Sequence, residues 1–351
     1  MFDIDFYMKS YDFMKDAQAG KTNDREGAFN FLESIRNKQP VVYNIETTNA
    51  CNMRCEMCPR TTMMTRPVVT MKPDLFKRIL GQIKPHSKEK WREWKKFVQE
   101  KYGIMPQDMG ENHFFLYIIP KVIQLHGYGD PLLDKNMALY VKLLAEKGFS
   151  SYFSCNPANT DIAKTTEMFE RGLDYIKYSI ESVDDARHKA VRGSVSNFTE
   201  SYNKILSILD IKKEKGLKTV VIITMLDLNK EWQKDDFARL IKLFAGKDVY
   251  IYMKSEDQQW YRQNYHGTSS VHWSEFCKHP WMSMTIKSNG EAAMCMEDFN
   301  NEIILGDASK ESLYDIWNGD KYHKFRHGHF DLPKGIKCVE ECDMKLAGEF
   351  L

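Results

Sequence analysis

The chain has 351 residues, enough for one large α/β domain or for a large domain with a smaller one. Its 50 Lys and Arg residues balance 49 Asp and Glu residues without a long run of either sign, which disfavours a nucleic-acid partner. No signal-peptide pattern opens the chain, and the longest apolar stretch, Val220–Leu226, is too short to span a bilayer. Composition therefore predicts a soluble, cytoplasmic protein.

Residues 1–40 are predicted to form a helical extension that ends at Pro40. From residue 41 onward, short β-type runs alternate with helical stretches. Six β-type runs are predicted, at 41–47, 122–126, 151–154, 175–180, 219–225 and 249–253. Such repeats indicate a parallel sheet with helices outside, but six are too few for a complete eight-stranded barrel. The fold expected over 41–257 is therefore α/β, a partial (β/α)6 parallel barrel with right-handed crossovers.

An insertion at 84–119 interrupts this alternation. Trp91, Trp94, Val98 and Tyr102 recur at helical spacing within it, which predicts an amphipathic helix. Two interpretations remain open. The insertion is either a helix packed on the surface of the barrel or a lid or partner-docking element, since long insertions are often functional.

The pattern changes again towards the C-terminus. Residues 258–276 read as a linker, and 277–351 as a small α+β domain. A hairpin is expected about Asn289-Gly290, which is a strong turn signal. A helix is expected from about 311 to 326, followed by loops that carry cysteines.

Three cysteines, Cys51, Cys55 and Cys58, follow the first predicted strand with the spacing CxxxCxxC. Loops at the carboxyl ends of barrel strands are where such folds carry their chemistry. Three thiolates can hold three irons of a [4Fe–4S] cubane and leave the fourth iron open to a small molecule. Disulfides are disfavoured in a long chain without an export signal. Zinc is the stronger alternative, but no fourth ligand lies nearby in sequence.

Four further cysteines stand in the C-terminal segment, at Cys277, Cys295, Cys338 and Cys342. Four thiolates could saturate a second, auxiliary cluster. A structural zinc ion bound by the same four residues is the alternative.

The loop from Cys51 to Cys58 closely resembles the signature of the radical S-adenosylmethionine (radical SAM) superfamily. The resemblance implies that the open iron binds the amino and carboxylate groups of S-adenosylmethionine. It implies that an electron from the cluster cleaves the sulfonium bond, and that the resulting 5′-deoxyadenosyl radical abstracts a hydrogen atom from the substrate. It also implies an external electron donor such as flavodoxin or ferredoxin.

The segment Gly127-Tyr128-Gly129-Asp130, after the second strand, resembles the glycine-rich segment of this family. The resemblance implies that its backbone and the Asp130 carboxylate hold the ammonium group of the cosubstrate. Most relatives carry Glu at this position, so the charge is kept and the reach is shorter.

Further positions match by resemblance. Ser179 and Glu181, at the end of the fourth strand, correspond to residues that contact the ribose. Arg192 precedes a glycine, as in the frequent Arg-Gly pair near the cosubstrate carboxylate or the substrate; a surface salt bridge is the alternative. Met57 stands where relatives usually have an aromatic residue, and its polarizable side chain can still lie against adenine.

The C-terminal segment resembles the twitch domain, a shortened form of the SPASM extension. Its four cysteines limit it to one auxiliary [4Fe–4S] cluster. A saturated cluster has no iron free for substrate, so it carries electrons or braces the fold. The resemblance therefore implies a dehydrogenase that oxidises a secondary alcohol of a sugar-like or aminocyclitol substrate.

Other hypotheses stay open. Cys155, at the end of the third strand, could donate a hydrogen atom to a substrate radical in an epimerase, although a free cysteine is often simply buried. Glu256, after the sixth strand, is a candidate proton acceptor, and solvated charge is its alternative. Peptide modification, or a non-enzymatic iron–sulfur or zinc scaffold, completes the set.

Overall fold

The computed structural model describes residues 1–18, 21, 24–254 and 277–330. A sheet of nine strands runs through it in the order β6-β5-β4-β3-β2-β1-β7-β8-β9. Each of the six predicted β-type runs overlaps one parallel strand, to within one residue where the strand extends beyond the run. The strands are β1 (Val42–Ile45), β2 (Val122–Gln124), β3 (Ser150–Cys155), β4 (Tyr175–Ser179), β5 (Val220–Leu226) and β6 (Tyr250–Lys254). The predicted partial barrel is thus confirmed.

The C-terminal domain continues the sheet of the barrel. Its first strand, β7 (Met284–Ile286), pairs in parallel with β1, and β8 (Glu291–Ala293) and β9 (Ile304–Asp307) follow antiparallel. The turn between β7 and β8 holds Gly290 at a φ of 95°, a conformation that favours glycine. The helix predicted at 311–326 is two helices, α13 (Leu313–Asn318) and α14 (Asp320–Gly328), because the chain is extended at Gly319.

One face of the sheet packs against the helices that connect the strands. These are α4 (Pro73–Leu80), α7 (Met137–Glu146), α8 (Ile162–Glu170), α9 (Asp185–Arg192), α10 (Phe198–Glu214) and α11 (Gln233–Leu243). Alternate strand residues such as Ile123, Phe153, Ile176 and Ile223 are fully buried on this side. We call this cluster the outer core.

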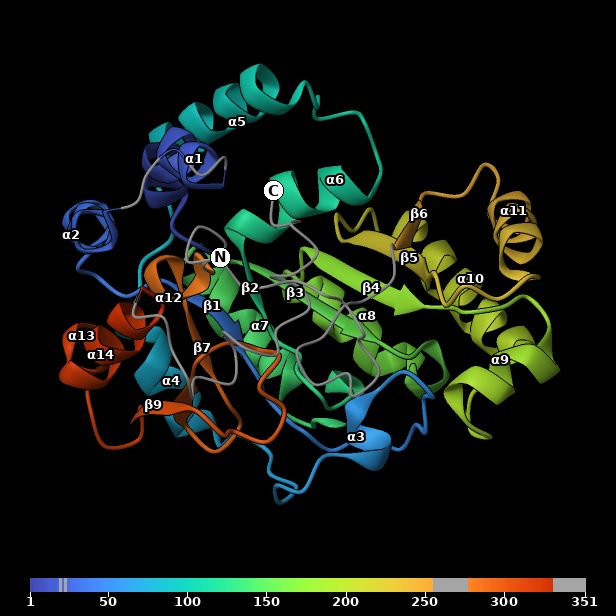
Figure 1. Ribbon diagram of the computed structural model, residues 1–351. Coiled ribbons are helices and arrows are strands. Elements are labelled where there is room, and N and C mark those ends of the chain that lie inside the picture. The colour runs from blue at the N-terminus through green and yellow to red at the C-terminus, as the bar shows by residue number, and fades with distance from the viewer. Residues whose placement is uncertain (19–20, 22–23, 255–276, 331–351) are drawn as a thin grey trace.

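The opposite face of the sheet is covered by the N-terminal extension and the insertion. The covering segments are α1 (Ile4–Gln18), α2 (Arg25–Ile35), α5 (Lys88–Tyr102), α6 (Glu111–His113) and the π-helical turn η1 (Phe114–Ile118). Figure 1 shows α1, α5 and α6 across the strands from α7 and α8. We call this second cluster, rich in Phe, Tyr and Trp, the inner core.

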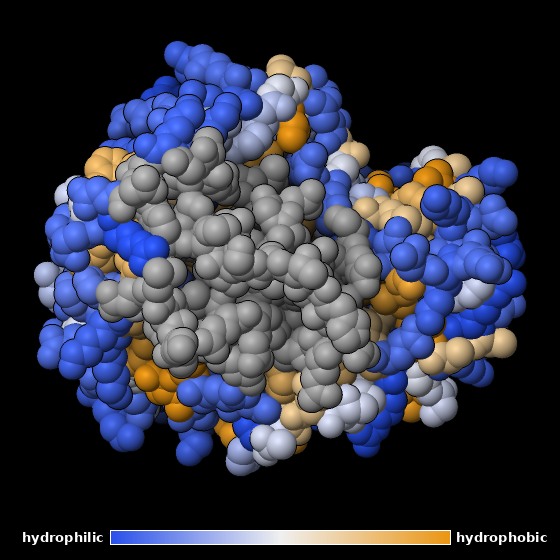
Figure 2. All heavy atoms as spheres, viewed as in Figure 1, coloured by the Kyte–Doolittle hydropathy of each residue, from blue (hydrophilic) through white to orange (hydrophobic). Residues whose placement is uncertain are grey.

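Trp94 shows how firmly the insertion is held. Its side chain is completely buried between Phe2 and Tyr7 of the N-terminal extension, and its Nε1 donates to Leu116 O at 2.7 Å. The insertion therefore packs on the barrel, as the first of its two interpretations expects. The surface over α1 and α5 is mostly hydrophilic (Figure 2), since their apolar side chains point inward. Within the described residues, no helix is both long and apolar enough to cross a membrane.

Candidate active site

The cysteine loop leaves the carboxyl end of β1 and is held from several sides. Ala50 O accepts from Asp130 N at 2.8 Å, and Arg54 N donates to Arg192 O at 3.1 Å. Thr61, in the short helix α3 (Pro59–Thr62), donates from its Oγ1 to Cys55 O at 2.8 Å. Hydrogen bonds to the loop after β2, to α9 and to α3 thus hold the cysteine loop in place.

Hydrogen-bond donors approach two of the loop thiols. Met53 N lies 3.4 Å from Cys51 Sγ, and Arg192 Nη1 lies 3.5 Å from Cys55 Sγ. Burial raises the pKa of Cys51, and it raises the pKa of Cys58 to about 12. Burial thus disfavours the thiolate form of both side chains, and a bound metal ion would favour it by supplying positive charge.

The donor set fits an iron–sulfur cluster. Across the described residues, no three His, Cys, Asp or Glu side chains converge closely enough to hold a single metal ion. Thiolates that bind a cubane cluster need not converge on one point, because each binds a different iron. Three thiols on one loop, two of them approached by N–H donors, match that requirement.

Two glycines let the loop after β2 press against the loop after β1. A Cβ on Gly129 would overlap Thr48 O and stand 2.7 Å from Asn49 Cα. A Cβ on Gly127 would stand 2.7 Å from Glu46 Cγ. Only glycine permits such close approach of backbone to its neighbours. The predicted cosubstrate segment therefore lies directly beside the cysteine loop.

Asp130 braces this arrangement. Its buried carboxylate accepts from Leu132 N at 3.0 Å, Asn156 N at 3.1 Å and Asn159 Nδ2 at 2.8 Å. Burial raises the pKa of Asp130. The geometry thus shows a carboxylate that ties the loops after β2 and β3 together, while its contact with the cosubstrate ammonium stays a prediction.

Glu181 and Arg192 form a buried ion pair. The other oxygen of Glu181 accepts from Leu226 N at 2.8 Å, so both oxygens have partners within the protein. Burial alone would lower the pKa of Arg192, but the charges of Glu181 and Cys55 raise it. The surface salt bridge considered for Arg192 is therefore wrong, because its side chain is only 15% exposed and lies beside Cys55. The contact of Glu181 with the ribose and that of Arg192 with the cosubstrate or the substrate stay predictions.

Ser179 and Met57 remain available for the predicted contacts. Ser179 ends β4 with its Oγ 3.5 Å from Ser154 Oγ, and it is partly exposed. Met57 is half-buried in the cysteine loop. Their contacts with ribose and adenine stay predictions.

Cys155 faces the helices. Its side chain is 6% exposed in the outer core, beside Phe153 on the same strand and Tyr178 on β4, and burial raises its pKa well above the ordinary value. Strand residues alternate between faces, so the inward position belongs to Ser154 instead. Cys155 therefore does not face the inner side of the sheet, where a hydrogen-atom donor would have to lie. Glu256, another catalytic candidate, lies outside the described residues.

Sequence reasoning missed a polar patch on the inner face of β2, β3 and β4. His126 Nδ1 accepts from Ser154 N at 3.3 Å, and Ser154 pairs in register with Lys177. The Lys177 ammonium lies 4.8 Å from the centre of the Phe114 ring and 5.7 Å from that of Tyr152. Burial and then Lys254 lower the pKa of Lys177 to about 7. A lysine two positions before Ser179 in an apolar strand was the available signal.

The C-terminal domain touches this site. Tyr128 OH donates to Glu297 Oε2 at 2.8 Å, two residues beyond Cys295. Glu46, fully buried, accepts from Arg66 Nη1 at 2.7 Å and from Ser288 N at 3.2 Å. Cys277 and Cys295 are both half-buried, whereas Cys338 and Cys342 lie outside the described residues. The cosubstrate loop thus contacts the domain predicted to carry the auxiliary cluster.

Two family models match the chain. The model of the radical SAM superfamily covers residues 45–241, more than half of the sequence. The chain belongs to the radical SAM superfamily. The second model, SPASM, is described as an iron-sulfur cluster-binding domain and covers residues 277–343, which include all four C-terminal cysteines.

Named relatives agree with this assignment. The S-adenosyl-L-methionine-dependent 2-deoxy-scyllo-inosamine dehydrogenase of Niallia circulans is 22% identical over 309 residues, which are 84% of this chain and 92% of that protein. The Streptococcus suis protein SuiB has a similar fold, with a TM-score of 0.53 and 11% identity over 97% of this chain and 82% of its own. So does anSMEcpe, solved with bound AdoMet, with a TM-score of 0.51, 12% identity and 82% of each chain covered.

The chain is therefore a radical SAM enzyme. Its cofactors are S-adenosylmethionine, a [4Fe–4S] cluster that binds it, and an auxiliary [4Fe–4S] cluster in the SPASM-type domain. The non-enzymatic scaffold hypothesis is wrong.

Proposed function

We propose that this enzyme oxidises a secondary alcohol of a sugar or aminocyclitol to a ketone. The observation that carries the proposal is the match to a curated dehydrogenase, named for 2-deoxy-scyllo-inosamine, over 84% of this chain and 92% of that protein. An enzyme that removes two electrons from its substrate needs a place for the second one, and a saturated auxiliary cluster is such a place.

The residues of this chain divide the work. Cys51, Cys55 and Cys58 hold the cluster that binds S-adenosylmethionine, which supplies the radical when bound. The backbone of the segment from Gly127 to Asp130 holds the ammonium group of the cosubstrate, Ser179 a ribose hydroxyl, and Met57 the adenine. Cys277, Cys295, Cys338 and Cys342 hold the auxiliary cluster, and a flavodoxin or ferredoxin is the external electron donor.

The hydroxyl proton of the substrate needs an acceptor. Loss of the carbinol hydrogen atom leaves a carbon radical that still carries its O–H; loss of that proton and one electron then gives the ketone. Lys177 is our candidate acceptor, because it lies on the inner face, pairs with no carboxylate among the described residues and has a pKa lowered to about 7. His126, Ser154 and Ser179 stand beside it as hydrogen-bond partners for substrate hydroxyls.

The epimerase hypothesis depended on Cys155 as the hydrogen-atom donor, and the position of Cys155 does not support it. Epimerisation needs a donor that faces the substrate, and the Cys155 thiol faces the outer core. The described residues of the inner polar patch include no cysteine that could replace it.

The test is an anaerobic assay of the reconstituted enzyme with a panel of sugars and aminocyclitols in deuterated buffer. We expect equal amounts of 5′-deoxyadenosine and ketone, with no solvent deuterium in the product skeleton. A substrate deuterated at the carbinol carbon should pass its deuterium to 5′-deoxyadenosine. An inverted carbon that carries one solvent deuterium would refute oxidation and restore epimerisation.

A further inference from the structure

A cavity of about 720 Å³ lies at the end of the barrel strands opposite to the cysteine loop. Lys121, directly before β2, and Ser150, the first residue of β3, form one wall, and the start of α5 forms the other. The cysteine loop, by contrast, follows the carboxyl end of β1. The volume falls within the range of small-molecule sites, about 300–1,000 Å³. No residue assigned above to catalysis or cofactor binding lines this cavity.

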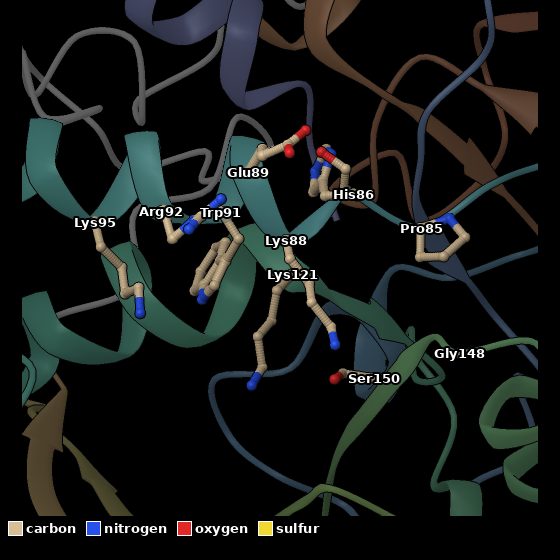
Figure 3. Close-up of a pocket in the computed structure, with 11 residues that line it drawn as sticks. Pro85, His86, Lys88, Glu89, Trp91, Arg92, Lys95, Lys121, Gly148 and Ser150 are labelled. Carbon is tan, nitrogen blue, oxygen red and sulfur yellow. The ribbon is translucent and has the colours of Figure 1, made fainter.

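Positive charge dominates its walls. Lys88, Arg92 and Lys95 lie on one side of α5 at spacings of four and three residues, and Lys121 faces them from the barrel. Figure 3 shows the side chains of Lys88, Lys95 and Lys121 extending to the same side, while Glu89 extends to the other side, towards His86. Glu89 is the single carboxylate among the described residues that line the cavity. Concave surfaces of one charge sign concentrate counter-ions.

The other lysines of α5 are neutralised. Lys90 pairs with Asp5, Lys96 with Glu100 at 3.7 Å, and Lys101 with Asp12 at 3.3 Å. The four cations of the cavity have no ion pair with a carboxylate among the described residues. The lysines of α5 without an ion pair among the described residues are therefore those that line the cavity.

Two titratable residues near the cavity, Asp174 and His86, leave its net positive charge in place. Asp174 lowers the field near Lys121, but its oxygens accept from Ser150 Oγ at 3.3 Å and Ser151 N at 2.9 Å. His86 adds no positive charge near neutral pH, because burial lowers its pKa to about 4. Its Nε2 is hydrogen-bonded to Phe2 O at 2.8 Å.

Trp91 adds a flat apolar surface between the cations. It lines the cavity from α5, and the buried side of its ring contacts the inner core. Aromatic side chains bind nucleobases by stacking with little regard to base identity, and nearby cations bind phosphate oxygens. We propose that this cavity binds a small phosphorylated molecule with a planar ring, of the mononucleotide class, in addition to the cosubstrate at the other end of the barrel.

The test measures binding of ADP and ATP to the full-length, cluster-loaded enzyme by calorimetry at low and high salt, with no substrate present. We expect saturable binding that weakens as salt rises. The double variant Lys88→Gln/Lys121→Gln should bind ADP about tenfold more weakly or worse. The matched control, Lys96→Gln/Lys101→Gln, removes the same number of charges at positions of α5 that do not line the cavity, and it should change affinity less than about twofold.

Trp91→Leu separates the ring from the phosphates. It should weaken ADP binding and leave tripolyphosphate binding unchanged, with iron content and circular dichroism as checks of folding. Three results would overturn the proposal: no saturable binding of either nucleotide, equal losses in the charge variant and its control, or tripolyphosphate binding as tight as ADP. A polyglutamate peptide that binds where nucleotides do not would also overturn it in favour of an acidic protein segment.

Discussion

The inner face of the sheet has two halves of opposite character. Towards the amino ends of the strands it is covered by aromatic side chains, such as Phe114, Tyr152 and Tyr250, which pack against the N-terminal extension and the insertion. Towards the carboxyl ends it carries His126, Ser154 and Ser179. Lys177 lies at the border, with its charge over two aromatic rings.

This division separates stability from chemistry. A complete barrel fills its interior with side chains of its own strands. Here there are only six parallel strands, and the N-terminal extension and the insertion cover the amino-end half of their inner face. The carboxyl-end half of that face stays polar. Substitutions in the amino-end half should therefore lower stability, and substitutions in the carboxyl-end half should lower activity.

The largest effect is expected from Cys51→Ala. Loss of one of three thiolates should abolish the S-adenosylmethionine-binding cluster and, with it, formation of 5′-deoxyadenosine. Iron and sulfide analysis and electron paramagnetic resonance would measure the loss of one cluster while the auxiliary cluster stays. Cys155→Ala is the matched control and should retain both clusters, at a cost in stability of roughly 1 kcal/mol. Full iron content in Cys51→Ala would contradict the ligand assignment.

Trp94→Ala tests the aromatic half. It removes a fully buried side chain and its hydrogen bond to Leu116 O, so the free energy of unfolding should fall by about 3–5 kcal/mol. Thermal denaturation would measure this. At low temperature the folded variant should still load both clusters and cleave S-adenosylmethionine. Trp91→Ala, at a half-buried position on the same helix, should cost less. Equal losses would mean that the inner core does not hold the insertion.

Lys177→Met tests the border between the halves. The neutral amine accepts a proton and the ammonium cannot, so ketone formation by the native enzyme should rise with pH through about 7. The variant should lose that rise and slow by about a hundredfold, while 5′-deoxyadenosine still forms. The charged or titratable neighbours that also act on Lys177 or respond to it are Lys254, Glu111, Arg192, Glu181 and His126.

Its control is Lys164→Met, an exposed lysine on α8 whose loss should change neither rate nor profile. An unchanged pH profile in Lys177→Met would remove Lys177 from the reaction.

Much of this division could not be predicted from the sequence. The strands were predictable because runs of β-branched and aromatic residues mark them. The cysteine ligands were predictable because their spacing is local. The facing of Cys155 was not, because a shift of one residue along a strand moves a side chain to the other face of the sheet.

Long-range partners were equally hidden. Glu181 and Arg192 were both singled out, but their mutual ion pair and the bond from Leu226 N depend on the packing of α9 and β5. The periodicity of the insertion predicted an amphipathic helix, but an apolar stripe does not name the surface that it covers. The split of the last predicted helix depends on the extended backbone at Gly319, inside an otherwise helical pattern.

Gly129→Ala offers the finest test of the carboxyl-end half, because it changes one methyl group between two loops. The added Cβ would overlap Thr48 O, so the cosubstrate segment must move away from the cysteine loop. Affinity for S-adenosylmethionine, measured by equilibrium dialysis, should fall about tenfold, equivalent to about 1.4 kcal/mol. Gly110→Ala is the control, since the backbone of Gly110 is extended and a Cβ there meets nothing closer than 3.9 Å. If Gly129→Ala binds S-adenosylmethionine as the native enzyme does, then the contact between the two loops is not what shapes the cosubstrate site, and the cysteine loop must be held in place from α9 instead.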